Sequence, residues 1–380
     1  MFIAMRDLSF AKGRFFLMAL VVVLIAFLTT LLSGLSAGLI KNNISGLMQL
    51  PVTHIAFEYD DEPTYRGTLV ERVMWEGWAT QPGVRAMEPL GHTVFNARGA
   101  DNDPLELTLW GVRPGSFTEP RVTAGQQLGA VRDGVIVSKI LADKGVKIGD
   151  TITLDRVLTQ FTVIGITEEA NIGHIPIVYA QLPIWQEATY GPPGGMPPGE
   201  AFPDVVYEYA SVIALQLEDE VDDAAIASID EQLGTATLKK VDRAYRASTG
   251  YLEEVRSVGM IQYSLILIAA VVIGAFFAIW TIQRTQEIGL VKALGATNGY
   301  LLRDSLGQAL LLLAVGTMTG LGAALWVGQY IMKTGRPFMY VPGTVSVAIV
   351  SLLVAGLIGG ALSVKRITAV DPMIALGRDR

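Results

Sequence analysis

The chain has 380 residues, of which 51% are hydrophobic and 17% are charged, and its formal net charge is −7. It contains no cysteine, which excludes disulfide bonds, thiolate metal sites and cysteine nucleophiles. The acidic balance, without a basic patch, argues against a nucleic-acid partner.

Four long runs without any charged residue predict membrane-spanning helices. A helix needs ~20 apolar residues to cross a bilayer, and every run is longer than that. A cleaved signal peptide is an alternative for the first run, but the apolar region of a signal peptide has only ~7–15 residues. The predicted spans are residues 15–40, 257–283, 305–332 and 337–364.

The positive charges that flank the spans predict their orientation. Lysine and arginine are concentrated in residues 1–14, 284–304 and 365–380, whereas the loop 333–336 holds only two. Positive charges favour the cytoplasmic side, so both termini and the 284–304 segment are expected in the cytoplasm. Residues 41–256 are then extracellular, and they carry 17 lysines and arginines against 31 aspartates and glutamates. The sequence therefore predicts a multi-pass protein of the cell membrane.

The extracellular segment alternates between strand-like and helical patterns, which predicts a mixed α/β domain. Expected strands are residues 52–59, 93–97, 105–110, 134–137, 151–154, 161–166 and 206–217. Expected helices are residues 69–81, 139–144, 182–188 and 222–233. Residues 41–50 and 240–256 are predicted to extend spans one and two as a helical stalk. The proline- and glycine-rich stretch 190–203 predicts a loop. The expected fold class is thus an α+β membrane protein with four transmembrane helices and a domain inserted after the first.

The cytoplasmic segment 284–304 begins with an amphipathic pattern. Ile288, Val291 and Leu294 recur at helical spacing, and Gly295 stands where a helix C-terminal glycine belongs. One interpretation is a short helix that rests in the headgroup region of the bilayer. The other is a coupling helix that buries its apolar stripe in a partner protein.

Several runs resemble permeases of the FtsX/MacB superfamily of ABC transporters. Residues 287–289 (EIG) and 292–297 (KALGAT) are similar to the coupling segment of that family. Residues 137–151 resemble a recurrent run of its outer domain, and residues 369–376 resemble its cytoplasmic tail. The order of one span, a large outer domain and three closing spans also matches, so the resemblance covers the whole chain.

The resemblance implies a permease homodimer that works in the lipid membrane with two copies of a separate ATPase. The sequence contains no GxxxxGK[ST] motif, so ATP and Mg²⁺ are expected on the partner subunit and the chain is not expected to be an enzyme. The residues expected to couple to the ATPase are Arg284, Glu287, Ile288, Gly289, Val291, Lys292, Leu294 and Gly295.

The opening residues 6–15 and 32–39 resemble the haem-exporting permeases of Gram-positive bacteria, the HrtB type. This resemblance implies export of haem, or of a similar amphiphile, with haem as the substrate and no permanently bound cofactor. The uncharged spans also argue against ion transport. Three alternatives stay open: a mechanotransmitting permease that activates a cell-wall hydrolase or an outer partner, an exporter of a lipid, peptide or antibiotic, and a sensor for a signalling system.

Four residues near the start of span two are the candidate substrate site. Glu253, Met260 and Tyr263 share one helical face and offer groups that can contact haem iron, while Arg256 could pair with a propionate. No other metal site is expected. In the alternative interpretation Met260 and Tyr263 pack a helix seam, and Glu253 and Arg256 form a solvated pair. The isolated His54, His92 and His174 are not included in the site.

Three glycine pairs in the spans have the GxxxG spacing that permits close helix packing. They predict either packing within one chain or, for the first pair, a dimer seam. The pairs are Gly34 and Gly38, Gly316 and Gly320, and Gly356 and Gly360.

Overall fold

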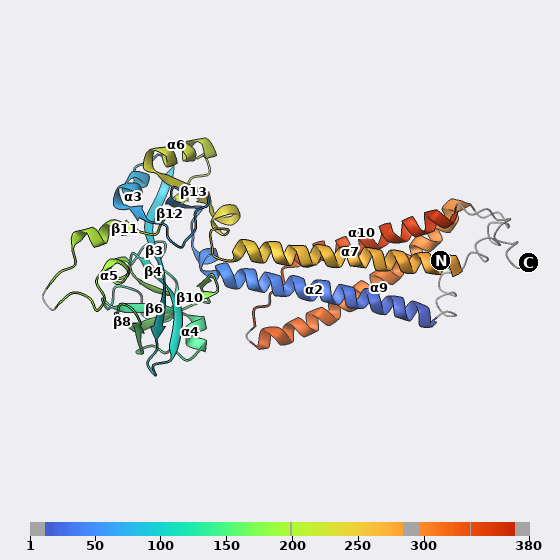
Figure 1. The fold of residues 1–380 in the computed structure, drawn as a ribbon, viewed down its shortest axis with the longest axis horizontal. Coiled ribbons are helices and arrows are strands. Elements are labelled where there is room, and N and C mark those ends of the chain that lie inside the picture. Colours follow the sequence, from blue (N-terminus) through green and yellow to red (C-terminus); the bar gives the residue numbers. More distant parts are fainter. Residues whose placement is uncertain (1–11, 198–199, 284–296, 335, 369–380) are drawn as a thin grey trace, which may run out of the picture. The chain divides into compact units, whose positions relative to one another are not determined.

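The chain divides into two compact units (Figure 1). The globular unit is Ile40–Glu253, and the helical unit combines Met1–Leu39 with Glu254–Arg380. A large mixed α/β domain and a set of apolar helices are both present, as the sequence predicts. The computed structural model describes residues 12–197, 200–283, 297–334 and 336–368.

An eleven-stranded sheet forms the frame of the globular unit. Its main path has the order β13-β1-β12-β3-β4-β10-β6-β8-β5, and β7 and β9 pair at its side. The pairs β4–β10 and β6–β8 are parallel and the others are antiparallel. The strands of this sheet are β1 (His54–Glu58), β3 (Val84–Arg98), β4 (Pro104–Val112), β5 (Val122–Gly125), β6 (Gly134–Ser138), β7 (Thr151–Leu154), β8 (Gln160–Thr167), β9 (Asn171–Ile172), β10 (Ile175–Gln181), β12 (Val212–Leu217) and β13 (Thr235–Lys239). A separate ribbon pairs β2 (Val70–Glu71) with β11 (Tyr209–Ala210).

The helices of the globular unit form two groups (Figure 1). In the first, α3 (Arg72–Ala79) and α6 (Asp223–Leu233) share a buried cluster with β1 and β12. In the second, α4 (Lys139–Asp143) and α5 (Leu182–Tyr190) share one with β4, β6 and β8. Local signals set the ends of α6, because the Asp222 carboxylate accepts a hydrogen bond from the N–H of Ala225 and Gly234 closes the helix at φ 68°.

The 15-residue strand β3 joins the two groups. Its first half pairs with β12 and its second half with β4. Where the halves meet, Gly91 lies opposite Gly111, and the Trp185 ring of α5 covers both. A Cβ atom on Gly91 would lie 2.1 Å from that ring, so only glycine allows the contact. The indole N–H of Trp185 donates to Thr93 Oγ1 at 3.1 Å, which fixes the ring over the strand.

Four helices make up the described part of the helical unit. They share a buried cluster that includes Met18, Val22, Ile273, Leu313 and Leu352. Three of them contain stretches long and apolar enough to cross a membrane, and in the fourth the apolar stretch Val345–Ile358 is shorter. The count of four spans therefore stays a prediction. The helices are α2 (Lys12–Gln49), α7 (Tyr251–Gln283), α9 (Asn298–Lys333) and α10 (Pro342–Thr368).

The glycines of the GxxxG pairs pack within the chain, as far as the structure describes their surroundings. Gly316 and Gly320 of α9 lie against Val22 and Ala26 of α2. Gly356 of α10 lies against leucine and isoleucine side chains of α9 and α7. Packing inside one chain, rather than a dimer seam alone, therefore explains these small residues.

The segment between α9 and α10 differs from its prediction. The span expected from residue 337 begins as a helix only at Pro342. Residues 336–341 form neither helix nor strand, and Pro337 and Phe338 pack against α2 and α9. The Phe338 ring lies between Gly34 of α2 and Gly328 of α9, and it is only 7% exposed. The N–H of Met339 donates to the Gly34 carbonyl at 3.0 Å. Phe338 thus acts as a wedge between the two helices.

Three other expected elements need correction. The predicted continuous helix 240–256 is a short π-helical turn, Lys240–Ala244, followed by turns that end at Gly250 with φ 78°. Helix α7 begins only after that glycine. The expected strand 206–217 contains a 3-10 helix, η1 (Asp204–Glu208), before β11 and β12, and the expected helix 69–81 is shortened by β2.

Alanine at Gly34 or Gly328 is expected to destabilise the purified protein, because the added methyl group would meet the Phe338 ring. Overpacking of this kind costs ~1–3 kcal/mol. The matched control is Gly322→Ala, whose Cβ would meet no atom within 4 Å and which should be neutral or stabilising. Thermal unfolding in detergent measures the difference.

In a Phe338→Ala background, the cost of Gly34→Ala should disappear because the wedge is gone. An unchanged cost in that background would show that the ring and the glycine are not coupled.

Candidate functional site

The four residues of the candidate substrate site all lie on α7. A continuous helix places residues spaced by three, seven and ten positions on one face, as the sequence predicts. Arg256 is exposed, and the side chains of Met260 and Tyr263 are 70% and 77% exposed. Glu253 is exposed at the last position of the globular unit. Their binding role stays a prediction.

Helix α7 is also the least covered of the three long apolar helices. Only 11% of its most apolar stretch is buried, against 33% for α2 and for α9. One side of α7 contacts α2, where Gln262 Nε2 donates to Ser33 Oγ at 3.1 Å. Leu267 and Val271, at 66% and 63% exposure, continue the uncovered surface beyond Tyr263. This surface is available to lipid, to a ligand or to a second copy of the chain.

The predicted ATPase-coupling residues lie outside the described residues. They are Arg284, Glu287, Ile288, Gly289, Val291, Lys292, Leu294 and Gly295. Their role therefore stays a prediction.

A buried amide marks the place where the chain enters and leaves the globular unit. Asn43 is fully buried near the end of α2. Its Nδ2 donates to the Thr249 carbonyl at 3.1 Å, and its Oδ1 accepts from Ser248 Oγ at 2.7 Å. The backbone carbonyl of Asn43 accepts from the N–H of Gly173 at 2.9 Å. One residue therefore ties the entering helix to the departing chain and to the turn between β9 and β10.

Further polar contacts hold the end of α2 inside the globular unit. Ser45 Oγ accepts from the N–H of Asn171 at 2.8 Å, and Gln49 Nε2 donates to the Glu169 carbonyl at 2.6 Å. Lys240 Nζ donates to the carbonyls of Met48 and Leu50. The helix departs from regular geometry at Ile44, where φ is −120°. Residues 41–50 are helical as predicted up to Gln49, but they are built into the domain.

This junction was not predicted from the sequence. The sequence feature that could have indicated it is the group of polar residues Asn42, Asn43 and Ser45 directly after a long apolar run. Three polar residues in one helical turn next to a span indicate hydrogen-bond partners, because buried polar groups are almost always paired.

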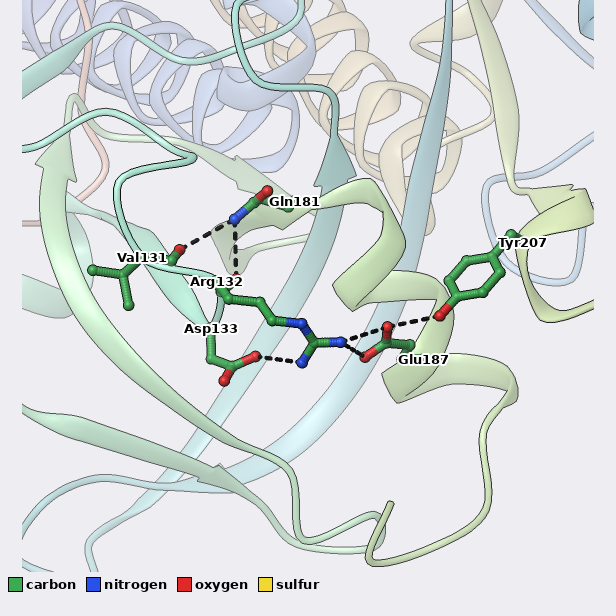
Figure 2. Close-up of polar contacts among 6 residues, drawn as sticks. All are labelled: Val131, Arg132, Asp133, Gln181, Glu187 and Tyr207. Atoms are coloured by element: carbon green, nitrogen blue, oxygen red, sulfur yellow. Dashed lines mark hydrogen bonds and ion pairs between the residues drawn. The ribbon is translucent and has the colours of Figure 1, made fainter. Parts of the chain in front are cut away.

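A second polar network connects the residues before and after the proline-rich loop 190–203, which follows α5 (Figure 2). Glu187 of α5 accepts two hydrogen bonds from Arg132 Nη2, at 2.7 and 2.8 Å, and one from the Tyr207 hydroxyl at 2.9 Å. Gln181 Nε2 donates to the carbonyls of Val131 and Arg132. Burial acts to lower the pKa of Arg132, but the hydrogen bonds and charge of Glu187 outweigh it and raise the pKa. Both ends of the loop are thus held at one carboxylate.

The three histidines lie apart in the globular unit. Burial lowers the pKa of His92 to about 4 and lowers that of His54 as well, so both are neutral at neutral pH. His174 Nδ1 contacts Asn42 Oδ1 at 2.8 Å. In the part of the chain that the structure describes, no group of three or more metal-ligating side chains comes together.

Comparisons with known proteins place both units in one family. A model of the MacB-like periplasmic core domain matches residues 15–232, and a model of the FtsX-like permease C-terminal region matches residues 259–372. A relative from Staphylococcus haemolyticus that carries the name hemin transport system permease protein HrtB is 25% identical over 99% of both chains. One of the same name from Staphylococcus epidermidis is 23% identical, also over 99% of both chains. Among solved structures, the periplasmic region of MacB from Actinobacillus actinomycetemcomitans has a TM-score of 0.37 and 14% identity, covering 53% of this chain and 94% of its own.

The variant Asn43→Leu is expected to destabilise the globular unit, because it leaves the Ser248 hydroxyl and the Thr249 carbonyl without their partner. An unpaired buried polar group costs ~1–3 kcal/mol. Asn42→Leu is the matched control, since the side chain of Asn42 makes its contact at the exposed side of the helix. Thermal unfolding and amide exchange at Gly173 test the prediction, and equal effects of the two variants would contradict it.

Proposed function

This chain belongs to the family of ABC transporter permeases with a MacB-like core domain and an FtsX-like C-terminal region, and we propose that it exports haem or a similar amphiphile from the membrane. Two relatives that are named for hemin transport and align over 99% of both chains support haem as the first candidate. The sequence has no P-loop motif, so we assign ATP hydrolysis to a separate subunit.

The observation that carries the proposal is the uncovered face of α7. Met260 and Tyr263 expose a thioether and a phenol at the start of an apolar helix, and both groups are known types of haem ligand. Arg256 lies one turn before Met260 and can pair with a propionate. The apolar surface that follows, at Leu267 and Val271, suits the macrocycle. Haem that has partitioned into the bilayer would meet this face from the side.

A second copy of the chain would complete the site. With only 11% of its apolar stretch buried, α7 leaves a large surface for a partner helix of the same kind. We therefore infer a permease homodimer with two ATPase subunits, which dock on the coupling residues between 284 and 295. Closure of the ATPases would then move the helices that line the haem face.

Force transmission without transport is the second candidate function. The junction at Asn43 favours it, because the end of α2 is hydrogen-bonded into the globular unit rather than loosely attached. A movement of α2 would therefore be passed to the whole domain. Such a permease would act on a cell-wall hydrolase or another outer partner, and polar changes on α7 would leave its activity intact.

A haemin titration of the purified full-length protein in detergent, followed by Soret absorption, tests the proposal. We expect saturable binding near one haem per dimer, weakened about tenfold by loss of the iron contact in Met260→Ala or Tyr263→Ala, which corresponds to ~1.4 kcal/mol. Arg256→Ala and Glu253→Ala should weaken binding less, because they act at the edge of the macrocycle.

Matched controls come from α9, where Met318 and Tyr330 are 65% and 69% exposed. Met318→Ala and Tyr330→Ala should bind haemin like the wild type. Saturable binding that none of the α7 changes affects would remove the proposed site but keep haem as the substrate. Partitioning without saturation would favour another amphiphile or force transmission.

A further inference from the structure

One edge of β3 is open along the middle of the strand. On one side, β4 pairs with β3 from Gly91 to Arg98. On the other side, β12 pairs only up to Leu90, and β7 pairs only with Ala97 and Arg98. Within the described residues, no strand covers this second side of residues 91–96.

The backbone groups on the open side can be identified from the pairing. In an antiparallel pair, alternate residues point their N–H and C=O away from the neighbouring strand. The N–H of His92 donates to Ser211 Oγ at 2.9 Å, and its carbonyl accepts from the same hydroxyl. The Asn96 carbonyl accepts from the N–H of Asp155 at 3.0 Å. His92, Val94 and Asn96 therefore face the open side.

Three backbone groups on this edge remain without a partner in the described part of the chain. They are the N–H and C=O of Val94 and the N–H of Asn96. Val94 is half-buried and Asn96 is exposed, so these groups are reachable from solvent. Unpaired N–H and C=O groups at a sheet edge are a template for pairing with another extended chain. The free backbone groups of this edge can therefore form hydrogen bonds with a ligand that supplies amide groups.

A pocket of about 590 Å³ lies along this edge. Besides residues of β3, the loop Arg66–Leu69 and the end of α5 at Thr189 and Tyr190 line this pocket. Arg66 and Glu106 also line it, and both are exposed. No ion pair of either side chain occurs among the described residues. The pocket thus offers a cation, an anion and a row of backbone groups.

We propose that this pocket binds a short extended peptide as an added strand on β3. The backbone of the peptide would pair with Val94 and Asn96, which is the main-chain recognition used in β-strand addition. Arg66 would take the peptide carboxylate and Glu106 the peptide ammonium group. The volume lies in the ~300–1,000 Å³ range of small-ligand pockets. The site belongs to the globular unit and is independent of haem binding at α7.

Isothermal titration of the full-length protein with tri-, tetra- and pentaalanine tests the proposal. We expect saturable binding of one peptide per chain, weakened at least about tenfold in Val94→Pro, because proline has no N–H and its ring obstructs the edge. The N–H of Val94 faces away from β4, so the ladder between β3 and β4 loses no bond and the variant should fold. Absence of binding by all three peptides, or full affinity in Val94→Pro, would overturn the proposal.

The charged ends are tested with the same peptides in acetylated and amidated form. Arg66→Ala should weaken peptides with a free carboxylate, and Glu106→Gln should weaken those with a free ammonium group, whereas blocked peptides should not respond. The controls Arg85→Ala and Glu220→Gln, exposed and outside the pocket lining, should bind like the wild type. Should Val94→Pro not fold, amide exchange of the wild type decides: peptide must slow exchange at Val94 and Asn96, and unchanged exchange would overturn strand addition.

Discussion

The hydrogen bonds of the buried Asn43 amide hold together, inside the globular unit, the two segments by which the chain enters and leaves it. This one side chain connects the entering helix α2 with Ser248 and Thr249, which lie directly before the start of α7. Both chain crossings therefore meet at a single polar point inside the domain. Because a buried amide without partners is costly, the two crossings are expected to move together.

Aromatic rings seated on glycines form the close contacts in both units. Trp185 covers Gly91 and Gly111 where the two halves of the sheet meet, and Phe338 lies between Gly34 and Gly328 where α2 meets α9. In each place the absent Cβ atoms give the ring a flat surface on two backbones at once. Close packing of this kind transmits displacement, because a well-packed interior has little room to yield. The two contacts thus leave little room for displacement within the sheet and within the α2–α9 helix pair.

The candidate haem face and the peptide pocket differ in how far the sequence could predict them. The spacing of Met260 and Tyr263 on one helical face follows from 3.6 residues per turn, so it could be predicted once a helix was assumed. Their exposure could not, because it depends on which neighbours α2 and α9 leave uncovered. The open edge of β3 could not be predicted from the sequence, since it exists only because β12 and β7 pair with other parts of the same strand.

The sequence by itself determined the apolar runs, the mixed α/β character of the inserted domain and short local elements such as β7, whose predicted and observed bounds agree. These features depend on hydrophobicity and side-chain periodicity within a few residues. Only the tertiary structure decided the full length of β3, in which Pro89 and Gly91 interrupt the strand pattern but are accommodated by β12 and Trp185. It also decided the break at Gly250 and the non-helical course of residues 336–341. In each case contacts between distant residues outweigh local preference, and a local pattern carries no information about such contacts.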